Sequence, residues 1–505
     1  MLGEDPQALE YSFVFCFIWA CGGCLHEKDG IDYRRQFNTW WRNEWKTIKF
    51  PNKGTIFEYY VDQAKLELWE TLVPEMDFDA DKPAAEITVA TPETVAMQHF
   101  INTLINIHAP VMLIGLAGCG KSQLCRGLLR SLNKEIYASY AINFNFYTNS
   151  ALLQTLLEQP LEKKAGRQYG PPGKLRLIYF LDDLNLPQLD PYNTQTAIAL
   201  LRQHLDYQHW YDRNKMQLKD INNTQYLACL NPAAGSFTIN PRLQRHFWTL
   251  SVPLPEQTSL FTIYNTILSN YFVKRNFRKA VQEHISFVVK ATLSLHTEVV
   301  QAFRKTAANF HYEFNMRHLS TVFQGLLAAT PQLYQEPDKL VLMWLHECER
   351  TYGDRLVSKA DFTKYKASAA DLTKKMFGKL NISKFIQAKN PEPIVFCHFA
   401  KGFQDSSYDR IASMAELSHL LQEALAEYND VNPVMDLVLF EDAMKHICRI
   451  TRIINNNAGH ALLVGVGGSG KQSLSRLSAF ISSCTPFQIT ISSKYDVKDL
   501  KNDIR

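Results

Sequence analysis

The side chains best suited to chemistry lie just after residue 110, where four apolar residues lead into the glycine-rich loop G-L-A-G-C-G-K-S at residues 115–122. This loop matches the complete P-loop pattern G-x-x-x-x-G-K-[ST]. Its glycines let backbone N–H groups approach phosphate oxygens closely, and the helix that follows adds the positive end of its dipole. In this pattern the lysine reaches the β- and γ-phosphates, and the hydroxyl holds Mg²⁺. We therefore predict a nucleoside triphosphate site formed by Gly115, Gly118, Cys119, Gly120, Lys121, Ser122 and Gln123, with Ser122 on the metal.

The other half of such a site is expected at residues 175–183, L-R-L-I-Y-F-L-D-D, an apolar strand that ends in two carboxylates. An acid at the carboxyl end of a strand beside the P-loop strand faces the metal ion. We predict that Asp182 contributes to the metal shell and that Asp183 polarises the attacking water. The alternative is a strand that merely ends in two solvent-facing acids.

Polar groups further along the chain are candidates for the same kind of site. Asn231 ends a third apolar strand at residues 225–231, where its amide would orient the water beside the γ-phosphate. Arg317 lies between apolar helical residues and would return over a bound nucleotide. Arg242 and Arg245 lie on a short basic segment, for which ordinary solvated surface is the alternative.

The P-loop pattern recurs 350 residues later, since its lysines are Lys121 and Lys471 (471 − 121 = 350). The apolar residues 461–464 parallel the first strand, and self-similarity at fixed spacing is typical of tandem modules. Gln472 replaces the hydroxyl residue, and its amide oxygen is a poorer Mg²⁺ ligand. The second loop comprises Gly465, Gly467, Gly468, Ser469, Gly470, Lys471, Gln472 and Ser473.

Strands and helices must alternate around these loops, which predicts an α/β fold with a parallel sheet. Thr91 as N-cap and Pro92 at the first helical position predict a helix to about residue 107. Aromatic residues before residue 80 predict a helical core, and residues 77–83 predict a linker. The remaining predicted elements are a P-loop helix at 123–132, a strand at 140–146, helices at 150–158 and 194–206, a turn at 170–173 and mainly helical structure from 256 to about 400.

Composition excludes several classes of protein. The 505 residues hold several domains, and a net charge of +4 does not imply nucleic acid as a partner. The most apolar run, residues 11–25, is shorter than the ~18–20 residues of a membrane span and follows acidic residues, so we expect a buried helix. Ten dispersed cysteines indicate reduced thiols and a cytoplasmic default. For the C-x-x-C pair Cys21 and Cys24, buried helical residues are favoured over a metal or redox role.

The motifs, in their order along the chain, resemble the dynein heavy chains, and more narrowly the axonemal ones. G-L-A-G-C-G-K-S, L-I-Y-F-L-D-D-L-N-L-P, C-L-N-P-A-A-G-S-F, N-P-R-L-Q-R-H-F and F-N-M-R-H-L-S resemble the third AAA+ module of the dynein ring. G-V-G-G-S-G-K-Q-S-L-S-R-L is similar to the fourth module, whose glutamine variant it shares. F-V-F-C-F-I-W-A-C-G-G-C-L resembles the end of the second module, so the resemblance covers essentially the whole chain.

The resemblance implies tandem AAA+ P-loop modules, each a parallel sheet flanked by helices with a small helical lid. It implies the roles of Walker A for the loop around Lys121, Walker B for Asp182 and Asp183, sensor I for Asn231 and sensor II for Arg317. An arginine finger at Arg242 or Arg245 would serve the nucleotide of the preceding module. The implied domains are the helical end of a preceding module (1–80), a large α/β domain (81–255), a helical lid with linker (256–405) and the start of the next large domain (406–505).

A segment of such a motor is expected to bind ATP or ADP with Mg²⁺ and to regulate minus-end-directed movement on microtubules in the axoneme of cilia or flagella. Its partners would be the other AAA+ modules of the same heavy chain and, through the full-length motor only, microtubules and dynein intermediate and light chains. Neither nucleic acid nor a membrane is expected as a partner. The family's main hydrolytic site and microtubule-binding stalk belong to other segments, so this polypeptide alone should not grip a microtubule. A midasin-like remodelling ATPase and a non-catalytic AAA+ scaffold are the alternatives.

Asp183 departs from the general AAA+ pattern, which has a glutamate at this position. The aspartate carboxylate is one methylene shorter, and misplacing a catalytic group by about 1 Å can cost on the order of 10²-fold in rate. We therefore predict that the Lys121 site binds ATP well and hydrolyses it slowly, as a regulatory site would. The lack of an arginine supplied in trans would slow turnover further.

Overall fold

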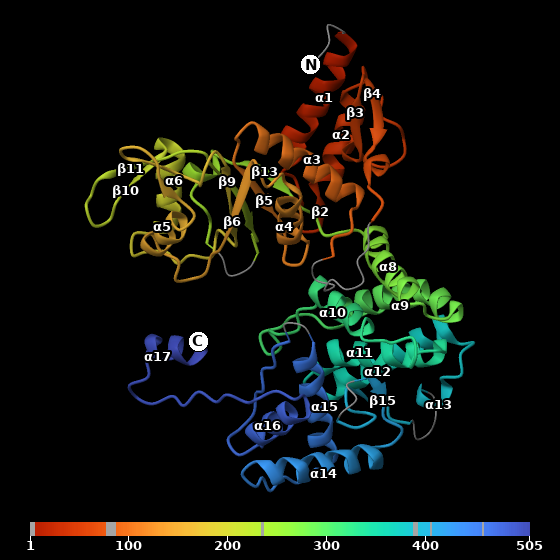
Figure 1. The fold of residues 1–505 in the computed structure, drawn as a ribbon. Coiled ribbons are helices and arrows are strands. Elements are labelled where there is room, and N and C mark those ends of the chain that lie inside the picture. Colours follow the sequence, from red (N-terminus) through yellow and green to blue (C-terminus); the bar gives the residue numbers. More distant parts are fainter. Residues whose placement is uncertain (1–5, 77–86, 234–236, 387–391, 404–406, 457–458) are drawn as a thin grey trace. The chain divides into compact units, whose positions relative to one another are not determined.

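The computed structural model describes residues 6–76, 87–233, 237–386, 392–403, 407–456 and 459–505 (Figure 1). The chain divides into two compact units, and the boundary between them falls after residue 263. The first unit carries the first phosphate loop, and the second unit carries the second loop. Among the described residues, no helix is both long enough and apolar enough to span a lipid bilayer.

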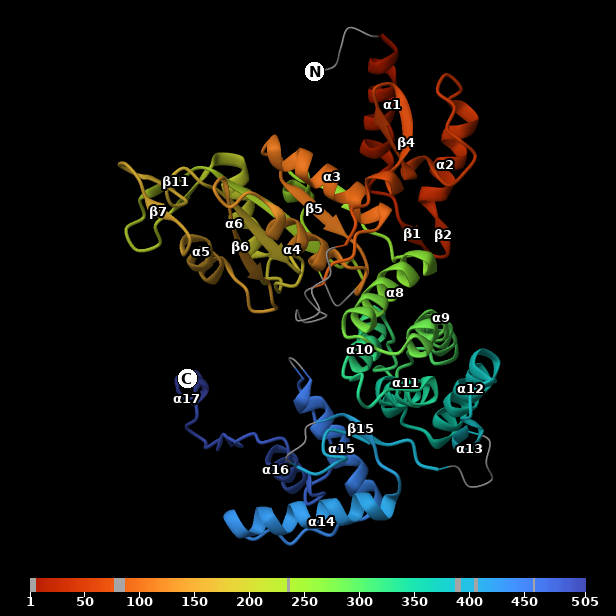
Figure 2. The same ribbon diagram turned by 45° about the vertical axis from the view of Figure 1, so that its right-hand side comes forward.

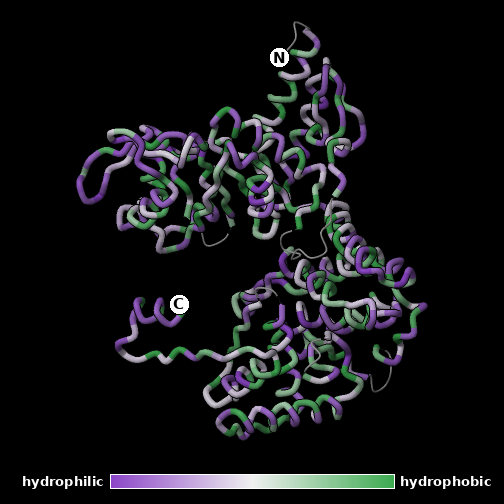
Figure 3. Tube along the Cα trace, viewed as in Figure 1, coloured by the Kyte–Doolittle hydropathy of each residue, from purple (hydrophilic) through white to green (hydrophobic). Residues whose placement is uncertain are grey.

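The first unit is built on a five-stranded parallel sheet. Its strands are β5 (Val111–Ile114), β6 (Tyr137–Asn143), β9 (Arg176–Asp182), β12 (Thr224–Leu230) and β13 (Trp248–Ser251). They are arranged in the order β13-β5-β12-β9-β6, and every neighbouring pair is parallel. Figure 3 shows hydrophobic segments along this sheet, because a parallel sheet covered on both faces needs apolar side chains in both directions.

Helices cover both faces of this sheet (Figure 2). Ile101 and Leu124 pack with Leu113 on one face, whereas Leu153 packs with Met112 on the other. Neighbouring residues of one strand thus enter opposite cores, as the two-residue period of a strand requires. The helices are α3 (Pro92–Asn106), α4 (Lys121–Ser131), α5 (Ser150–Glu158), α6 (Thr196–Tyr207) and the short α7 (Pro241–Gln244).

Most of these elements begin and end within a few residues of their predicted positions. The helix predicted after Thr91 is α3, and the N-cap hydroxyl accepts a backbone hydrogen bond as expected. The strand predicted at 140–146 is displaced, since β6 ends at Asn143 and the Thr148 N–H then donates to the Asn145 carbonyl at 3.1 Å in a turn. The edge strand β13 was not predicted from the sequence.

A second, four-stranded sheet in the first unit was also not predicted. Its strands are β7 (Glu162–Lys163), β8 (Gln168–Gly170), β10 (His209–Tyr211) and β11 (Leu218–Ile221), in the order β10-β11-β8-β7. β8 and β11 pair in parallel although β9 of the main sheet, α6 and β10 lie between them in the sequence. Lys219 supports this sheet through contacts of 3.0 Å with both Glu158 and Asp212. Pairing between distant short segments leaves little local pattern to recognise.

Residues 6–76 combine helices with short hairpins, so the helical core predicted for this region describes only part of it. The aromatic core itself is confirmed, since Trp41 and Trp69 are buried and Trp41 stacks on Trp45 with 5.1 Å between ring centroids. Residues 77–83, the predicted linker, lie outside the described residues. The elements are α1 (Pro6–Gly22), β1 (Glu27–Lys28), β2 (Ile31–Asp32), α2 (Tyr33–Glu44), a 3₁₀ turn (Ile56–Glu58), β3 (Tyr59–Asp62), β4 (Lys65–Leu68) and a second 3₁₀ turn (Trp69–Leu72).

The apolar run at residues 11–25 forms most of α1, but only one face of this helix is buried. Val14 is 1% exposed, whereas Phe13 is 56% exposed. Cys21 and Cys24 are both exposed, so the prediction that they are buried residues is wrong. The physical reason is that Gly22 and Gly23 take the core-facing positions at the end of α1, and the two cysteines on either side of them are left exposed.

The second unit is mainly helical, as predicted for residues 256 to about 400. Between and after these helices lie only a 3₁₀ turn (Gly353–Arg355) and the two-residue strands β14 (Phe396–Cys397) and β15 (Asp409–Arg410) among the described residues. The helices are α8 (Gln257–Lys274), which begins in the first unit, α9 (Lys279–Ala302), α10 (Met316–Leu326), α11 (Pro337–Thr351), α12 (Lys359–Phe377), α13 (Ser383–Ile386), α14 (Met414–Val431), α15 (Glu441–Asn455), α16 (Lys471–Ile481) and α17 (Val497–Ile504).

A buried ion pair joins α11 to α15 inside the second unit. Arg452 Nε donates to both carboxylate oxygens of Glu347 at 3.1 Å, and Arg452 Nη2 contacts Oε2 as well. The Tyr408 hydroxyl donates to Glu347 Oε1 at 2.6 Å. Burial favours the neutral acid, but the Arg452 charge outweighs it and holds the pKa of Glu347 below its ordinary value. The core of this unit therefore contains a fully paired carboxylate.

Candidate nucleotide site

The first phosphate loop connects the end of β5 to the start of α4. Gly118 and Gly120 have φ of +84° and +90°, a left-handed conformation that glycine adopts without steric cost. Gly115 permits a close approach, because a Cβ there would collide with the Val252 carbonyl oxygen and lie 2.8 Å from Cys119 Sγ. The chain thus turns tightly from strand to helix, and free N–H groups at a helix start suit a phosphate group.

Lys121 is held inside this loop. The residue is 8% exposed, and its Nζ donates to the carbonyl oxygens of Gly115 and Leu116 at 2.7 and 2.8 Å. Cys119 Sγ lies 3.5 Å from the same nitrogen. Phosphate oxygens would compete with these two carbonyls for the three ammonium protons.

The strand that ends in acids meets the loop. β12 lies between β5 and β9, so the carboxyl ends of all three strands share one edge of the sheet. There Ser122 Oγ donates to Asp182 Oδ1 at 2.9 Å, and the Asp182 side chain is only 14% exposed. The alternative of a solvent-facing acid therefore does not describe Asp182. A hydroxyl and a carboxylate so close together fit a magnesium ion bound next to phosphates.

Asp183 and Asn231 follow neighbouring strands at the same edge of the sheet. Asp183 comes directly after β9, is exposed and has φ of +56°, whereas Asn231 comes directly after β12. The Asn185 side chain donates to the Asn231 carbonyl at 2.9 Å and so ties the two strand ends together. Both side chains start from the edge that carries Asp182, and their roles toward water stay predictions.

The arginines predicted from the sequence have different surroundings. Arg245 Nη2 donates to Asp206 Oδ1 at 2.7 Å, so this guanidinium is engaged within its own unit. Arg242 is exposed in the short α7, and the arginine-finger role of either residue stays a prediction. Arg317 is exposed in the first turn of α10, in the second unit, and its sensor role stays a prediction.

The second phosphate loop repeats the local geometry of the first. Gly468 and Gly470 have φ of +75° and +76°. Lys471 Nζ donates to the carbonyl oxygens of Gly465 and Val466 at 2.8 and 2.6 Å, the same contacts that Lys121 makes. The helix α16 starts at the lysine, as α4 does. The repeated sequence therefore encodes a repeated loop conformation.

The strand predicted before this second loop is wrong. Leu462 and Val464 are 89% and 88% exposed, and residues 459–466 pair with no strand in the part of the chain that the structure describes. Strand structure depends on hydrogen bonds to a neighbouring strand, and an apolar run alone does not provide them. Gln472 occupies the hydroxyl position of this loop.

One charged residue near the first loop escaped the sequence analysis. Arg126 Nη2 lies 3.6 Å from Asp182 Oδ2, the oxygen that does not contact Ser122. Its spacing was the available signal, because residues four apart on a helix share a face and Arg126 follows Ser122 by four. Arg476 lies five residues after Lys471, just as Arg126 lies five residues after Lys121.

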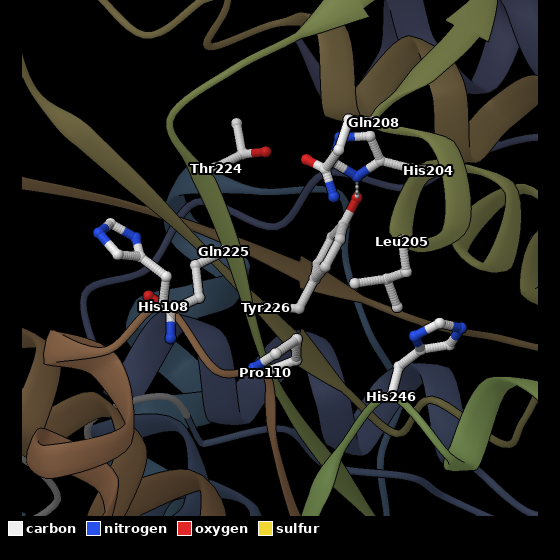
Figure 4. A pocket seen from close by; sticks show the side chains of 9 residues that line it. All are labelled: His108, Pro110, His204, Leu205, Gln208, Thr224, Gln225, Tyr226 and His246. Atoms are coloured by element: carbon white, nitrogen blue, oxygen red, sulfur yellow. Dashed lines mark hydrogen bonds between the residues drawn. The ribbon is translucent and has the colours of Figure 1, made fainter.

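A separate pocket of about 170 Å³ lies at the opposite edge of the sheet (Figure 4). It opens at the start of β12 and before β5, whereas the phosphate loop follows β5, so this pocket is not the nucleotide site. Inside it, His204 Nδ1 and the Tyr226 hydroxyl lie 2.8 Å apart. The lining residues are His108, Pro110, His204, Leu205, Gln208, Thr224, Gln225, Tyr226 and His246.

Acid is expected to destabilise the first unit through His204. The residue is 1% exposed, and burial lowers its pKa from 6.5 to about 4. Between these two values the unfolded chain binds a proton that the folded unit does not, so the stability is complete above pH 6.5 and falls as the pH drops toward 4. The free energy of unfolding should therefore fall between pH 7 and 4.5. We expect this fall to be about 2 kcal/mol smaller in His204→Gln than in the wild type, measured by urea unfolding at each pH. An unchanged pH dependence in this variant would contradict the role of His204.

Four family descriptions match the chain in order. "Dynein heavy chain AAA lid domain" matches residues 3–71, and "P-loop containing dynein motor region" matches residues 76–255. "AAA+ lid domain" matches residues 288–386, and "P-loop containing dynein motor region D4" matches residues 435–505. The two P-loop matches contain the Lys121 and Lys471 loops.

Similar proteins are dynein heavy chains of cilia and flagella. The chain is 50% identical over 504 residues both to the dynein alpha chain of the flagellar outer arm of Chlamydomonas reinhardtii and to dynein axonemal heavy chain 17 of Homo sapiens. It is 47% identical to the ciliary dynein beta chain of Tripneustes gratilla. Each match covers 99% of this chain and 11% of the relative, so the chain spans about a tenth of the length of these relatives. The matches favour a dynein over a midasin-like remodelling ATPase, and the chain belongs to the axonemal dynein heavy chains as a segment of their AAA+ motor region.

Proposed function

We propose that this chain is the ATP-binding segment of a ciliary or flagellar dynein, in which the Lys121 site regulates minus-end-directed movement along microtubules. The observation that carries the proposal is the 2.9 Å hydrogen bond from Ser122 Oγ to Asp182 Oδ1 beside the Lys121 loop. Lys121 and the loop N–H groups would hold the phosphates of ATP or ADP, and Ser122 and Asp182 would hold Mg²⁺. The metal would supply positive charge that offsets the charge of the phosphates.

The remaining residues would act on water and on neighbouring modules. Asp183 would polarise the attacking water, and Asn231 would orient that water. Arg317 would contact the nucleotide as sensor II, and Arg242 or Arg245 would reach the site of the preceding module. The Lys471 loop would bind phosphates with little help from metal, because Gln472 replaces the hydroxyl ligand.

The proposed domain division follows from these roles. Residues 1–80 would end a preceding AAA+ module, 81–255 would form a large domain, 256–405 a helical lid with linker, and 406–505 the start of the next large domain. In such rings nucleotide binding acts through rigid-body rotation of modules against one another. Microtubules and dynein intermediate and light chains would be partners of the full-length motor, whereas the direct partners of this segment would be the other modules of the same chain.

Replacing Lys121 with alanine is expected to weaken the binding of a fluorescent ATP analogue by roughly 10- to 100-fold. The ammonium group would make charge-assisted hydrogen bonds to phosphate, each worth about 1.5–3 kcal/mol. Fluorescence titration with Mg²⁺ present measures the dissociation constant and the number of sites. Lys471→Ala, tested in parallel, isolates the contribution of the second loop.

Lys134→Ala is the matched control, since Lys134 is an exposed lysine shortly after α4 and its removal changes the net charge equally. We expect this variant to bind like the wild type. If the wild type shows no saturable binding that depends on Lys121, the chain is instead a non-catalytic AAA+ scaffold. That result would overturn the proposed function.

A further inference from the structure

The carboxylate of Asp182 contacts two different groups through its two oxygens. Oδ1 accepts the hydrogen bond from Ser122, and Oδ2 lies 3.6 Å from the guanidinium of Arg126. Ser122 and Arg126 are four residues apart on α4, so both project from the same face of this helix. The Asp182 side chain is 14% exposed and that of Arg126 is 49% exposed, so one partner of the ion pair is largely shielded from water.

This arrangement places a permanent positive charge beside the oxygens that would attract a metal cation. Arginine stays protonated at any physiological pH, so its charge cannot be titrated away. A cation next to a carboxylate lowers the negative potential that a second cation experiences there. The Ser122 hydroxyl already orients the carboxylate through Oδ1, so Arg126 is not required for that orientation.

The second loop provides an internal comparison. Arg476 follows Lys471 by five residues, as Arg126 follows Lys121 (476 − 471 = 126 − 121 = 5). Arg476 Nη2 donates to the amide oxygen of Gln488 at 2.7 Å, so there the same arginine contacts a neutral group. Arg126, at the same spacing, contacts the Asp182 carboxylate.

We propose that Arg126 competes with Mg²⁺ for the Asp182 carboxylate and thereby sets the Mg²⁺ concentration at which the first site fills. The guanidinium must give up part of its interaction with Oδ2 when a divalent cation approaches. The site then needs a higher Mg²⁺ concentration to be half filled than it would need if Asp182 contacted Ser122 alone. This inference rests on the proposed nucleotide binding.

The test is a Mg²⁺ titration of the whole chain in the presence of fluorescent ADP at constant ionic strength. Arg126→Gln is expected to lower the Mg²⁺ midpoint by roughly two- to fivefold, the equivalent of a partly exposed ion pair. Arg126→Lys retains the positive charge, and we expect its Mg²⁺ midpoint to stay close to that of the wild type. Because salt screens such pairs, the difference between wild type and Arg126→Gln should shrink in 0.5 M KCl.

Arg130→Gln is the matched control, because Arg130 is an exposed arginine one turn further along α4 and its loss changes the net charge equally. Its midpoint should equal that of the wild type. Circular dichroism melts and the affinity for fluorescent ADP without Mg²⁺ should be the same for all four proteins, which separates this role from a structural one.

Three results would overturn the inference: a midpoint that Arg126→Gln leaves unchanged, a midpoint that it raises, or an equal shift in Arg130→Gln. If the wild type binds fluorescent ADP and its midpoint behaves in one of these ways, only the role of Arg126 fails. If the wild type binds no fluorescent ADP at any Mg²⁺ concentration, the proposed function fails and the inference fails with it.

Discussion

Replacing Asp183 with glutamate is expected to accelerate single-turnover ATP hydrolysis at the Lys121 site by up to about 100-fold. The backbone at this position is set by the end of β9 and by the left-handed φ of +56°, so the substitution changes chiefly the reach of the carboxylate. An added methylene would carry the acid toward the place that the usual AAA+ glutamate occupies. The measurement is the conversion of radiolabelled ATP by excess protein, in a longer segment that includes the complete following module and its arginine.

Asp183→Asn controls for the loss of the carboxylate, and it should hydrolyse ATP no faster than the wild type. The affinity for the ATP analogue should be the same in all three proteins, because Asp183 is not expected to hold phosphate. A glutamate variant that hydrolyses ATP at the wild-type rate would refute the argument from side-chain length. The slow turnover would then require another cause, such as the supply of the arginine finger.

Replacing Glu347 with leucine is expected to destabilise the second unit by about 3–5 kcal/mol. Glu347 is fully buried, and the substitution leaves the Arg452 guanidinium, 7% exposed, without its carboxylate in the core. The Tyr408 hydroxyl loses its acceptor at the same time. For a unit of this size the melting temperature should fall by about 10 °C, measured by circular dichroism or differential scanning calorimetry.

Two further variants separate the buried pair from charge in general. The double variant Glu347→Leu with Arg452→Met should recover most of the lost stability, because removing both charges leaves neither one buried alone. Glu441→Leu breaks the exposed pair of Glu441 with Lys445 on the same helix α15, and it should lower stability far less than Glu347→Leu does. Equal losses in the Glu347 and Glu441 variants would show that burial of the pair is unimportant.

The sequence predicts well the strands that are buried on both faces and the helix whose first turn carries its own signal. The strands β5, β9 and β12 lie inside the sheet, and burial on both faces produces the continuous apolar runs that identified them. The helix α3 is marked by the chemistry of its own first turn, at Thr91 and Pro92. In both cases the signal is contained in a few consecutive residues.

The elements that were missed depend on partners far away in the sequence. β13 lies at the edge of the main sheet, and β8 pairs with β11 across a long stretch of chain. The opposite error occurred at residues 461–464, where an apolar run suggests a strand and no described strand pairs with it. Cys21 and Cys24 were misjudged for a similar reason, since the side of the chain that is buried at the end of α1 depends on how Gly22 and Gly23 pack against distant residues.

The candidate site shows the same contrast between features recorded in consecutive residues and contacts between distant ones. Both phosphate loops and the convergence of Ser122 with Asp182 could be predicted, because the P-loop pattern records the close approach of backbone to phosphate in its own residues. The pairing of Arg126 with Asp182 joins a helix to a strand more than fifty residues later, and no motif records it. Arg317 could be named as a candidate from its helical surroundings, whereas its assignment as sensor II comes only from the resemblance and stays a prediction.

The left-handed glycines and the lysine contacts of the second loop form although no described strand flanks it. The conformation of each loop therefore lies in its own glycines and lysine, whereas Asp182 reaches the first loop from a separate strand. Under the proposed function, nucleotide binding and hydrolysis then depend on different residues, so a substitution at Asp183 would change the rate of hydrolysis and leave binding in place.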